Sequence, residues 1–426
     1  MNSPEAWAMP GNAASARYGA LGFALAFVAL PLYISLPAHY AQEFGMPLAQ
    51  LGALLLGARL FDALLDPWIG RLCDRWLNQH PARVLPLMRA AALLLAGGFA
   101  AVFFPPWRTP SSLLLWCAAA LLLTYFGYSL LSVMHQTWGA RFGGSAVQQS
   151  RVVAWREGFA LVGVITASLL PGWIGLAGTA LTLALALGVG LLLLGRAPRA
   201  PAVSTATRSK GPAVSVWQRQ DFRRLMAVFL CNGIATAIPA SLLLFFVRDR
   251  LQTPQWEGAY LAAYFCAAAL SLPLWLRMVK RWDHARSWFA AMLLAVAAFA
   301  WAALLGEGDS LAFTAVCIAS GLAMGADLAI PSALLARLVH GAGLGGHAEG
   351  AFFGWWNAAN KLNLALAAGL SLPMLQALGY APGLRDVNAL QALTVAYCLL
   401  PCLLKLLAAG LLYQFRIRTA LNEDLP

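Results

Sequence analysis

The chain has 426 residues, of which 61% are hydrophobic and only 11% are charged, and its mean hydropathy is +0.69. A soluble globular domain carries roughly 25% charged residues, so this composition excludes an ordinary soluble globule. The formal net charge is +12, but the basic residues gather in the connections between apolar stretches, which argues against a nucleic-acid-binding protein.

Twelve apolar stretches are each long enough to cross a membrane, for which a helix needs about 20 residues. They predict an all-α membrane protein with twelve transmembrane helices. The predicted spans are residues 18–40, 47–70, 86–105, 112–138, 153–175, 177–195, 222–247, 257–277, 286–305, 310–336, 350–378 and 389–415. The first sixteen residues hold no basic stretch and no small-residue cleavage site, so no cleaved signal peptide is expected.

The distribution of basic residues predicts the orientation. If successive connections lie on opposite sides, 22 of the 29 Lys and Arg residues fall on the side of the N-terminus and 4 on the other side. Cytoplasmic connections carry the excess of basic residues, so both termini are predicted to be cytoplasmic, in a multi-pass protein of a bacterial-type inner membrane. The seven cysteines form no C-x-x-C pair and lie mostly within spans, which favours neither disulfides nor a thiolate metal site.

A stretch rich in Pro, Ser, Thr and Arg divides the chain into two sets of six predicted spans. We therefore predict an N-terminal bundle at 1–195, a cytoplasmic linker at 196–220 and a C-terminal bundle at 221–426. A shift of 206 residues aligns the two halves without a gap at Pro67 and Pro273, Arg71 and Arg277, and Trp76 and Trp282. Two pseudo-symmetric six-helix bundles are typical of transporters, in which substrate binds between the halves.

Asp62 and Asp66 lie one helical turn apart in the second predicted span, so both carboxylates share one helix face. A charged side chain at the centre of a membrane helix costs about 2.5–3.5 kcal/mol, and it is kept mostly where it binds an ion, passes a proton or holds a polar substrate. The pair could supply oxygen ligands to Na⁺, or one member could carry a proton. The alternative interpretation is a structural cluster with Arg59 and Arg71. The aligned positions of the second half are Ala268 and Leu272, which favours a functional role for the carboxylates.

The fourth predicted span contains Ser129, Ser132 and Gln136 at i, i+3 and i+7, which places them on one face. They could bind a cation or a polar substrate, or they could hydrogen-bond neighbouring helices. His135, in the same span, could titrate or simply pack.

Charged residues in three further spans are candidates for function. Asp327 in the tenth and Lys361 in the eleventh could form a buried ion pair or contact substrate, and Lys361 lies in a Trp- and Asn-rich stretch with Asn357. Arg156 begins the fifth span beside Glu157, where it could extend to the membrane surface.

Two connections on the predicted cytoplasmic side could form salt bridges that close that side and break as the halves rock, or they could be solvated loops. They contain Asp74 and Arg75 after the second span and Arg281 after the eighth. The sequence contains no G-x-x-x-x-G-K-[ST], no H-E-x-x-H and no G-x-S-x-G motif, so neither ATP-driven transport nor the common hydrolytic reactions has support.

These motifs resemble a known family. Gly70-x-x-x-Asp74-Arg75 resembles the loop signature of the major facilitator superfamily (MFS). Ala58-Arg59-Leu-Phe-Asp62-Ala-Leu-Leu-Asp66-Pro67 resembles the A-R-x-x-D-A-x-x-D-P segment of the melibiose permease group, the glycoside–pentoside–hexuronide:cation symporters. Further similarity lies at Arg17-Tyr18-Gly19, at Asn232-Gly233-Ile234, and at Phe352-Phe353-Gly354-x-Trp356-Asn357-x-x-x-Lys361.

The resemblance implies the MFS fold, alternating access, and coupling to Na⁺ or H⁺. It implies that Asp62, Asp66 and Ser129 bind the cation and that Arg156 and Lys361 take part in sugar binding or coupling. The chain departs from the sugar-binding members at Ala26 and Ser132, where they carry carboxylates, so the resemblance does not imply a galactoside substrate.

We therefore expect a secondary active transporter, a Na⁺- or H⁺-coupled symporter of a small polar organic solute such as a sugar or glycoside. The expected partners are the solute, the coupling cation and the lipid bilayer, with no other cofactor, no nucleic acid and a monomeric state. One alternative is a proton-coupled exporter of amphipathic compounds. Another is a polytopic membrane enzyme acting on lipid-linked substrates.

The expected site residues form three groups. Asp62, Asp66 and Ser129 are expected at the cation site, where the two carboxylates would be the metal ligands for Na⁺. The residues expected at the substrate site are Ser132, His135, Gln136, Arg156, Asp327, Asn357 and Lys361. Those expected to gate the cytoplasmic side are Asp74, Arg75 and Arg281.

Overall fold

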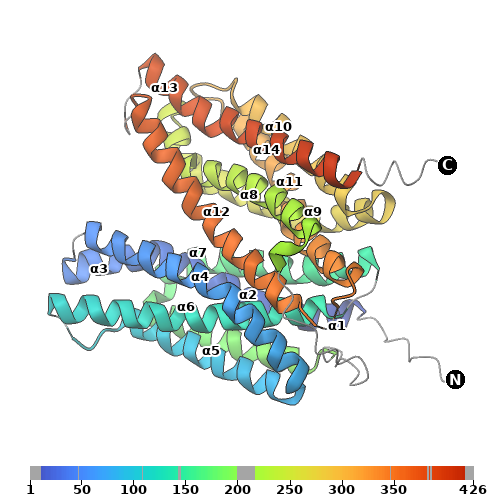
Figure 1. Cartoon of the computed structure of the whole chain (residues 1–426). Coiled ribbons are helices and arrows are strands. Elements are labelled where there is room, and N and C mark those ends of the chain that lie inside the picture. The colour runs from blue at the N-terminus through green and yellow to red at the C-terminus, as the bar shows by residue number, and fades with distance from the viewer. Residues whose placement is uncertain are drawn as a thin grey trace, which may run out of the picture. The chain divides into compact units, whose positions relative to one another are not determined.

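The computed structural model describes residues 11–46, 48–107, 109–142, 145–198, 216–345, 347–380, 383 and 386–417. Within these ranges the chain is helical almost throughout and contains no strand (Figure 1). This confirms the predicted all-α class. The physical reason is that a backbone in lipid must satisfy its own hydrogen bonds, which a helix does within one segment.

Every predicted span coincides with helical structure. The first half consists of α1 (Asn12–Gly19), α2 (Leu21–Phe27), the π-helical turn η1 (Pro31–Ser35), α3 (Leu36–Phe44), α4 (Leu48–Gln79), α5 (Pro81–Phe103), α6 (Pro110–Ala140) and α7 (Ala146–Gly195). The second half consists of η3 (Val216–Gln218), α8 (Gln220–Phe245), η4 (Phe246–Arg250), η5 (Pro254–Trp256), α9 (Glu257–Trp282), α10 (His284–Ala302), α11 (Ser310–Gly341), α12 (Glu349–Ala377), α13 (Val387–Thr394), η6 (Val395–Leu399), α14 (Leu400–Leu412) and η7 (Tyr413–Ile417).

The helix α7 contains two predicted spans. The chain turns between them at Gly175, whose φ of 68° lies in the left-handed region that glycine adopts without a steric penalty. Counting these two spans separately, nine segments of the described chain are long and apolar enough to cross a membrane. The other three predicted spans correspond to α1–α3, to α4 and to α12, and the last two contain the charged residues described below.

The chain divides into two compact units. Unit 1 comprises Met1–Val214 together with Ala336–Ala358, and unit 2 comprises Ser215–Leu335 together with Ala359–Pro426. The end of α11 and the beginning of α12 therefore pack with the N-terminal helices, although they follow the predicted linker in sequence. Most of that linker, residues 199–215, lies outside the described ranges.

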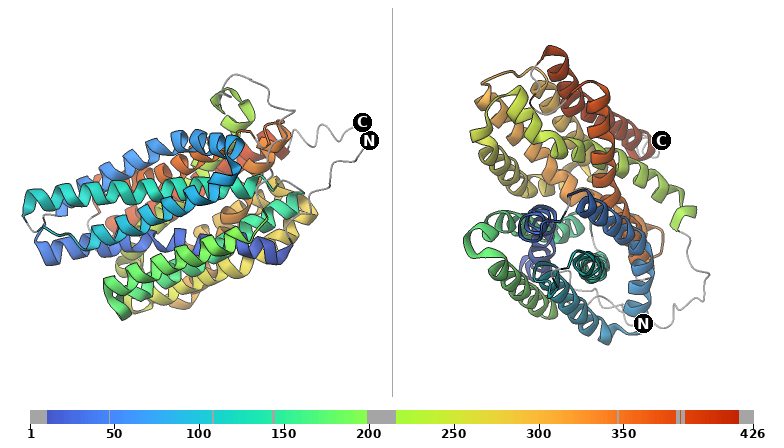
Figure 2. Two further views of the ribbon diagram at one scale, coloured as in Figure 1. Left: turned by 90° about the horizontal axis from the view of Figure 1, so that it is seen from below. Right: turned by 90° about the vertical axis from the view of Figure 1, so that its left-hand side faces the viewer.

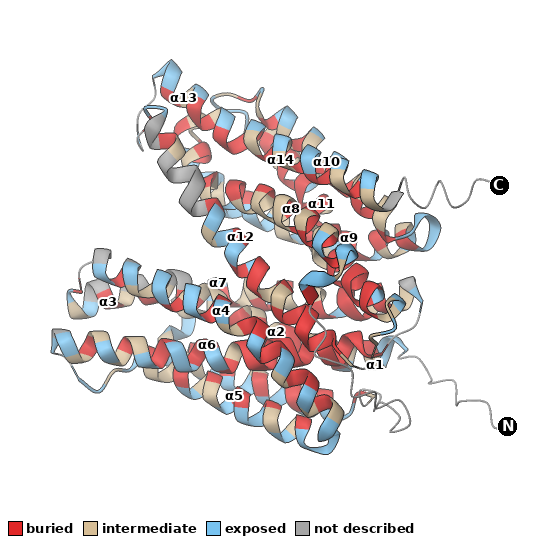
Figure 3. Cartoon of the chain, viewed as in Figure 1, coloured by how far each residue is buried: buried red, intermediate tan, exposed pale blue. Residues whose placement is uncertain are grey.

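In unit 1, α7 packs against α1, α2 and α5, and α6 packs against α4 and α5. Figure 2 shows from two further directions that these helices run side by side. Buried residues line the helix faces that meet inside the unit, whereas the outward faces are exposed and largely apolar (Figure 3). Such apolar outward faces are expected of helices surrounded by lipid.

In unit 2, α14 packs against α8 and α10, and α9 packs against α10. Phe246, Phe313 and Tyr397 are buried in its core, where the rings of Phe246 and Tyr397 stack with centroids 4.2 Å apart. Aromatic stacking of this kind adds about 0.5–1.5 kcal/mol to the burial of the rings and fixes their packing.

Candidate functional site

The helix α4 buries the face that carries the two predicted carboxylates. Ala58, Asp62 and Asp66, spaced one turn apart, are 6%, 1% and 0% exposed. Leu64 and Trp68 are 78% and 66% exposed, which places them on the lipid-facing side of the same helix. Both carboxylates therefore point into the protein, as a functional pair requires, because a carboxylate facing hydrocarbon would have no polar partner.

The helix α6 supplies a hydroxyl to this pair. Ser129 donates a hydrogen bond of 2.6 Å from Oγ to Oδ1 of Asp62. The guanidinium of Arg59 lies 3.7 Å from Oδ2 of Asp62 and 5.6 Å from the ring centre of Tyr125. The structure thus brings Asp62 and Ser129 together, and it places Asp66 one turn further along the same buried face. Carboxylate and hydroxyl oxygens are the ligands that a hard cation such as Na⁺ prefers.

Three of the predicted substrate residues are linked by hydrogen bonds. The side-chain amide of Gln136 donates to Oγ of Ser132 at 3.1 Å and to Oδ1 of Asn357 at 3.0 Å. Asn357 belongs to the part of α12 that packs in unit 1. These three side chains can both donate and accept hydrogen bonds, so together they are chemically suited to bind the hydroxyl groups of a solute.

Two other predicted substrate residues make polar contacts inside unit 1. Nε2 of His135 contacts the carbonyl of Tyr18 at 2.9 Å, and the two rings stack with centroids 4.3 Å apart. Because a carbonyl only accepts, Nε2 must carry the proton, and the contact ties α1 to α6. Arg156 is buried and forms an ion pair of 2.6 Å with Glu157.

The anticipated ion pair of Asp327 with Lys361 is not formed. Asp327 instead pairs with Lys405 of α14, at 3.0 Å between Oδ2 and Nζ. Oδ1 of Asp327 accepts from Asn232 at 3.0 Å and from Trp288 at 2.7 Å, and Lys405 also donates to Asn232 at 2.8 Å. The carboxylate is thus satisfied on both oxygens. Lys361 is buried on α12, in the part that belongs to unit 2.

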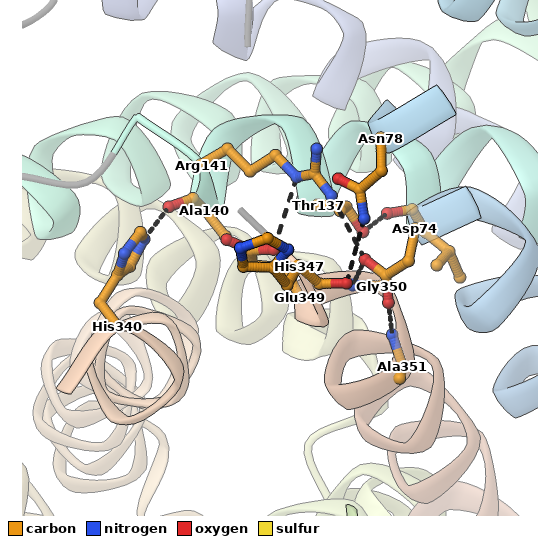
Figure 4. A network of polar contacts seen from close by, with 11 residues as sticks. Asp74, Asn78, Thr137, Ala140, Arg141, His340, His347, Glu349, Gly350 and Ala351 are labelled. Atoms are coloured by element: carbon orange, nitrogen blue, oxygen red, sulfur yellow. Dashed lines mark hydrogen bonds and ion pairs between the residues drawn. The ribbon is translucent and has the colours of Figure 1, made fainter. Parts of the chain in front are cut away.

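The predicted gating residue Asp74 lies in a network inside unit 1 (Figure 4). Its two carboxylate oxygens accept the backbone N–H groups of Gly350 and Ala351, each at 2.8 Å. These are the first free N–H groups of α12, where a helix favours a negative charge. Arg141 contacts Asp74 at 3.5 Å and Glu349 at 3.4 Å.

Two peripheral bonds join the same region. Asn78 donates to the carbonyl of His347 at 3.2 Å, and the ring of His340 contacts the carbonyl of Ala140 at 2.7 Å. Burial raises the pKa of Asp74 to about 7, against the opposing effects of Arg141 and of the two backbone N–H groups. Asp74 therefore titrates near neutrality in this arrangement.

Arg75 also belongs to unit 1, but its side chain is exposed and forms no ion pair with a residue that the structure describes. Arg281 belongs to unit 2, where its side chain is likewise exposed. Within unit 1, Arg141 contacts both Asp74 and Glu349, and the sequence reasoning did not name Arg141 or Glu349 in this network. One signal was present, because opposite charges stand at the ends of the fourth and eleventh predicted spans on the same predicted side of the membrane.

The second half is tightly packed at the positions that align with the carboxylate pair. Ala268, which aligns with Asp62, is fully buried. A side chain added at Gly325 of α11 would lie 2.7 Å from the carbonyl oxygen of Ala268, so the two backbones are in direct contact. The aligned positions of unit 2 therefore carry no carboxylate, whereas unit 1 has two carboxylates and the hydroxyl of Ser129.

Comparisons with known proteins agree with this architecture. A family model described as "MFS/sugar transport protein" matches residues 15–419. The inner membrane symporter YicJ of Escherichia coli (strain K12) is 21% identical over 252 residues, which cover 55% of this chain and 55% of that protein. The match therefore spans about half the length of this relative.

Solved structures share the fold of this chain. A bacterial homologue of the iron transporter ferroportin, in an outward-facing state, superposes with a TM-score of 0.73 at 14% identity, over 95% of this chain and 99% of that one. The E. coli fucose:proton symporter FucP superposes with a TM-score of 0.65 at 16% identity, over 92% and 98% of the two chains. These similarities establish the MFS fold of twelve helices.

Proposed function

The chain belongs to the MFS/sugar transport protein family, and from this premise we propose that it is a cation-coupled symporter of a small polar organic solute. Family and fold make it a multi-pass membrane transporter, so the enzymatic alternative falls away. We further propose that the solute is a sugar or glycoside, that the protein is a monomer in a bacterial-type inner membrane, and that both termini face the cytoplasm.

The observation that carries the proposal is the buried carboxylate pair of unit 1. Asp62 and Asp66 are at most 1% exposed, they share one face of α4, and the hydroxyl of Ser129 contacts Asp62 at 2.6 Å. Burying two carboxylates in a membrane helix costs several kcal/mol, and binding of a cation offsets that cost in the loaded state. An ion that binds there can couple its gradient to solute movement.

Arg59 gives this site a built-in counter-ion. Its guanidinium lies 3.7 Å from Oδ2 of Asp62, and its side chain is 22% exposed, so it has room to move. We propose that Arg59 neutralises Asp62 in the empty state and withdraws when the cation binds. The site then remains close to neutral throughout the cycle, which keeps the charge in the membrane small.

One relative and the chemistry of the site support the proposed direction of coupling. The relative found by sequence is named a symporter, and the row formed by Ser132, Gln136 and Asn357 offers amide and hydroxyl groups to a polar solute. An exporter of amphipathic compounds would be better served by an apolar surface. Uptake of a hydroxylated solute is therefore the function that the site supports best.

The cation site can be tested without knowing the solute. Purified protein in detergent is titrated with Na⁺ at constant ionic strength, and intrinsic tryptophan fluorescence and ²²Na⁺ binding are measured at pH 6 and pH 8. We expect saturable binding that Asp62→Asn and Asp66→Asn abolish. Loss of the charge-assisted bond in Ser129→Ala should weaken binding about tenfold, whereas Ser129→Thr keeps the hydroxyl and most of the affinity.

The matched control is Glu307→Gln, which removes an exposed carboxylate far from the pair in sequence and should bind as the parent does. If Na⁺ does not bind, release of protons to a weakly buffered medium identifies H⁺ as the coupling ion. Reconstituted protein is then tested for uptake of a pentose, a hexoside and a hexuronide under an inward Na⁺ or H⁺ gradient. Unchanged ion-dependent transport by Asp62→Asn and Asp66→Asn would overturn the assignment.

A further inference from the structure

Asn363, in the part of α12 that belongs to unit 2, is a buried amide without a hydrogen-bond partner. The residue is 3% exposed. Both of its polar side-chain atoms, Oδ1 and Nδ2, are enclosed, and neither forms a hydrogen bond with any residue in the described part of the chain. By contrast, Asn232 of α8, also buried in unit 2, has both polar atoms hydrogen-bonded, to Asp327 and Lys405.

The neighbours of Asn363 on its own helix face are apolar. Ala359 and Ala367 lie one turn before it and one turn after it, and both are buried. All three residues lie inside the predicted span 350–378, where lipid offers a polar group no partner. Burying an amide unpaired is unfavourable, so an apolar side chain would stabilise this position. A polar residue that persists at such a cost needs a functional explanation.

The helix α8 leaves the space that this amide occupies. A Cβ at Gly233 would clash with Nδ2 of Asn363 and would lie 2.6 Å from its Cγ, so only glycine leaves room for the amide there. Gly233 is partly exposed, which places the amide next to an accessible point of unit 2. Because no hydrogen bond holds the amide in this position, it can turn towards a ligand without losing one.

We propose that Asn363 determines the specificity of transport by binding two adjacent hydroxyl groups of the solute, an inference that rests on the symport proposed above. A primary amide presents an acceptor oxygen and N–H donors side by side. It can therefore accept a hydrogen bond from one hydroxyl and donate one to the next. The solute class that fits is a neutral sugar or glycoside with a vicinal diol, and binding of the diol satisfies the amide.

Loss of the amide should have opposite effects on stability and on solute binding. Leucine has the branched shape of asparagine without its polar atoms, so Asn363→Leu removes the cost of the unpaired amide. We expect this variant to unfold a few degrees above the parent. Its KM for the solute should rise about tenfold, because the hydrogen bonds to the diol are lost. A residue needed only for the fold would not give a more stable protein with weaker solute binding.

Thermal unfolding of the purified full chain and cation-driven uptake by the reconstituted protein test the proposal. The probes are D-xylose, methyl β-D-glucoside and the analogues of each that lack a single ring hydroxyl. The parent should take up the sugar about tenfold better than the analogues that lack a hydroxyl of the bound pair. In Asn363→Leu this discrimination should disappear, at two adjacent ring positions only. The control Asn388→Leu removes an exposed asparagine of α13 and should keep the parent's discrimination.

Unchanged discrimination by Asn363→Leu, or unfolding of this variant below the parent's temperature, would overturn this inference alone. Should Asn363→Leu fail to fold, Asn363→Ala decides the question by its discrimination, because the smaller side chain also removes the amide and cannot overpack. Ion binding by either variant should equal the parent's, since the amide is not among the proposed cation ligands. Absence of cation-driven uptake of both sugars by the parent would overturn the proposed function, and this inference with it.

Discussion

At the scale of single residues, Asp74 shows how a buried charge is tolerated at the end of a membrane helix. It is 7% exposed, yet it accepts two backbone N–H groups at 2.8 Å and lies 3.5 Å from Arg141. Desolvation favours its neutral form, whereas these three partners favour the ionised form. We propose that this near balance makes the docking of α12 on α4 easy to release.

The balance predicts a pH dependence. Because the pKa of Asp74 in the docked arrangement is about 7 and lies above its ordinary value of 3.8, docking binds protons. The stabilisation of docking by protonated Asp74 is then greatest below about pH 4. This stabilisation is lost as the pH rises through about 7. Hydrogen-exchange protection of the Gly350 and Ala351 amides should fall between pH 5 and pH 8. In Asp74→Asn the protection should not vary with pH. A fall of equal size in that variant would show that another group causes the effect.

Lys405 and Asp327 form a second buried charge pair, in unit 2. Asp327 also accepts hydrogen bonds from Asn232 and Trp288, and Lys405 also donates to Asn232, so the pair is satisfied without a ligand. Removing one member leaves an unpaired charge in a buried environment, which costs about 3–5 kcal/mol, whereas replacing both by apolar residues is often tolerated.

We therefore predict that Lys405→Met lowers the free energy of unfolding by about 3–5 kcal/mol, and that adding Asp327→Leu restores most of the loss. Thermal unfolding of the detergent-solubilised variants, arranged as a double-mutant cycle, measures the coupling. The expectation that Asp327 binds substrate makes the opposite prediction. If Asp327→Asn loses uptake and keeps the parent's thermal stability, Asp327 belongs to the substrate site.

At the scale of helices, the contact between α4 and α12 depends on glycine. Gly350 and Gly354 form a G-x-x-x-G pair, and Gly70 lies opposite them on α4. A Cβ at Gly354 would clash with the carbonyl oxygen of Asp66 and lie 3.0 Å from Cα of Pro67. Small residues at this spacing let membrane helices approach closely. The approach places the backbone of α12 against the turn that carries Asp66.

Gly354→Ala should therefore destabilise the docked arrangement by about 1–3 kcal/mol, the usual cost of overpacking. Thermal unfolding of the purified variant measures the loss, and hydrogen exchange of the α12 amides locates it. Gly57→Ala is the matched control, since that glycine is also on α4 and a Cβ there meets nothing within 4 Å. Equal stability of the two variants would show that the close approach is unimportant.

At the scale of the whole molecule, the two sequence halves share a helix pattern and differ in chemistry. Asp62 of unit 1 aligns with Ala268 of unit 2, and the second half fills the corresponding place with the backbone of Gly325. One unit therefore carries a buried carboxylate pair and the other a close contact between two helices at the aligned positions. We interpret this asymmetry as the division between a half that binds the coupling ion and a half that does not.

The proposed topology follows from the charge distribution and can be tested by labelling. In a variant without the seven native cysteines, a cysteine replaces Glu307, in a predicted external connection, or Thr205, in the predicted cytoplasmic linker. A membrane-impermeant maleimide should label Glu307→Cys in intact cells and Thr205→Cys only after permeabilisation. The positive-inside argument places both termini on the cytoplasmic side together with the linker. The reverse labelling pattern would show that the protein has the opposite orientation in the membrane.

Much of the fold could be predicted from the sequence because the membrane restricts the choices. An apolar stretch of about 20 residues has one stable backbone conformation in lipid, so the helical spans follow from hydropathy alone. The i, i+4 spacing of Asp62 and Asp66 likewise means that both side chains lie on one face of the helix. The division of α7 into two spans at Gly175 could also be predicted, since the two predicted spans meet close to this residue.

The candidate site was only partly predictable. The pairing of Ser129 with Asp62 was expected, because the resemblance implied that both residues bind the same cation. The partner of Asp327 was not found, since Lys405 is 78 residues away and several spans offer a basic residue to the same carboxylate. The ion-pair partner of Asp74 was not predicted for a similar reason. Arg75 and Arg141 are equally plausible by sequence, and only the packing of α6 beside α4 selects Arg141.

The sequence by itself determined the class of protein and the number of spans. It also determined which charged residues lie within spans and so need a partner. Hydrophobicity and helical periodicity are local properties, and a local pattern is sufficient to specify them. The tertiary structure alone decided which charge meets which, where glycine lets two backbones touch and which end of α12 packs with the first half. These depend on contacts between helices far apart in the chain, and many pairings of similar residues satisfy the same local pattern.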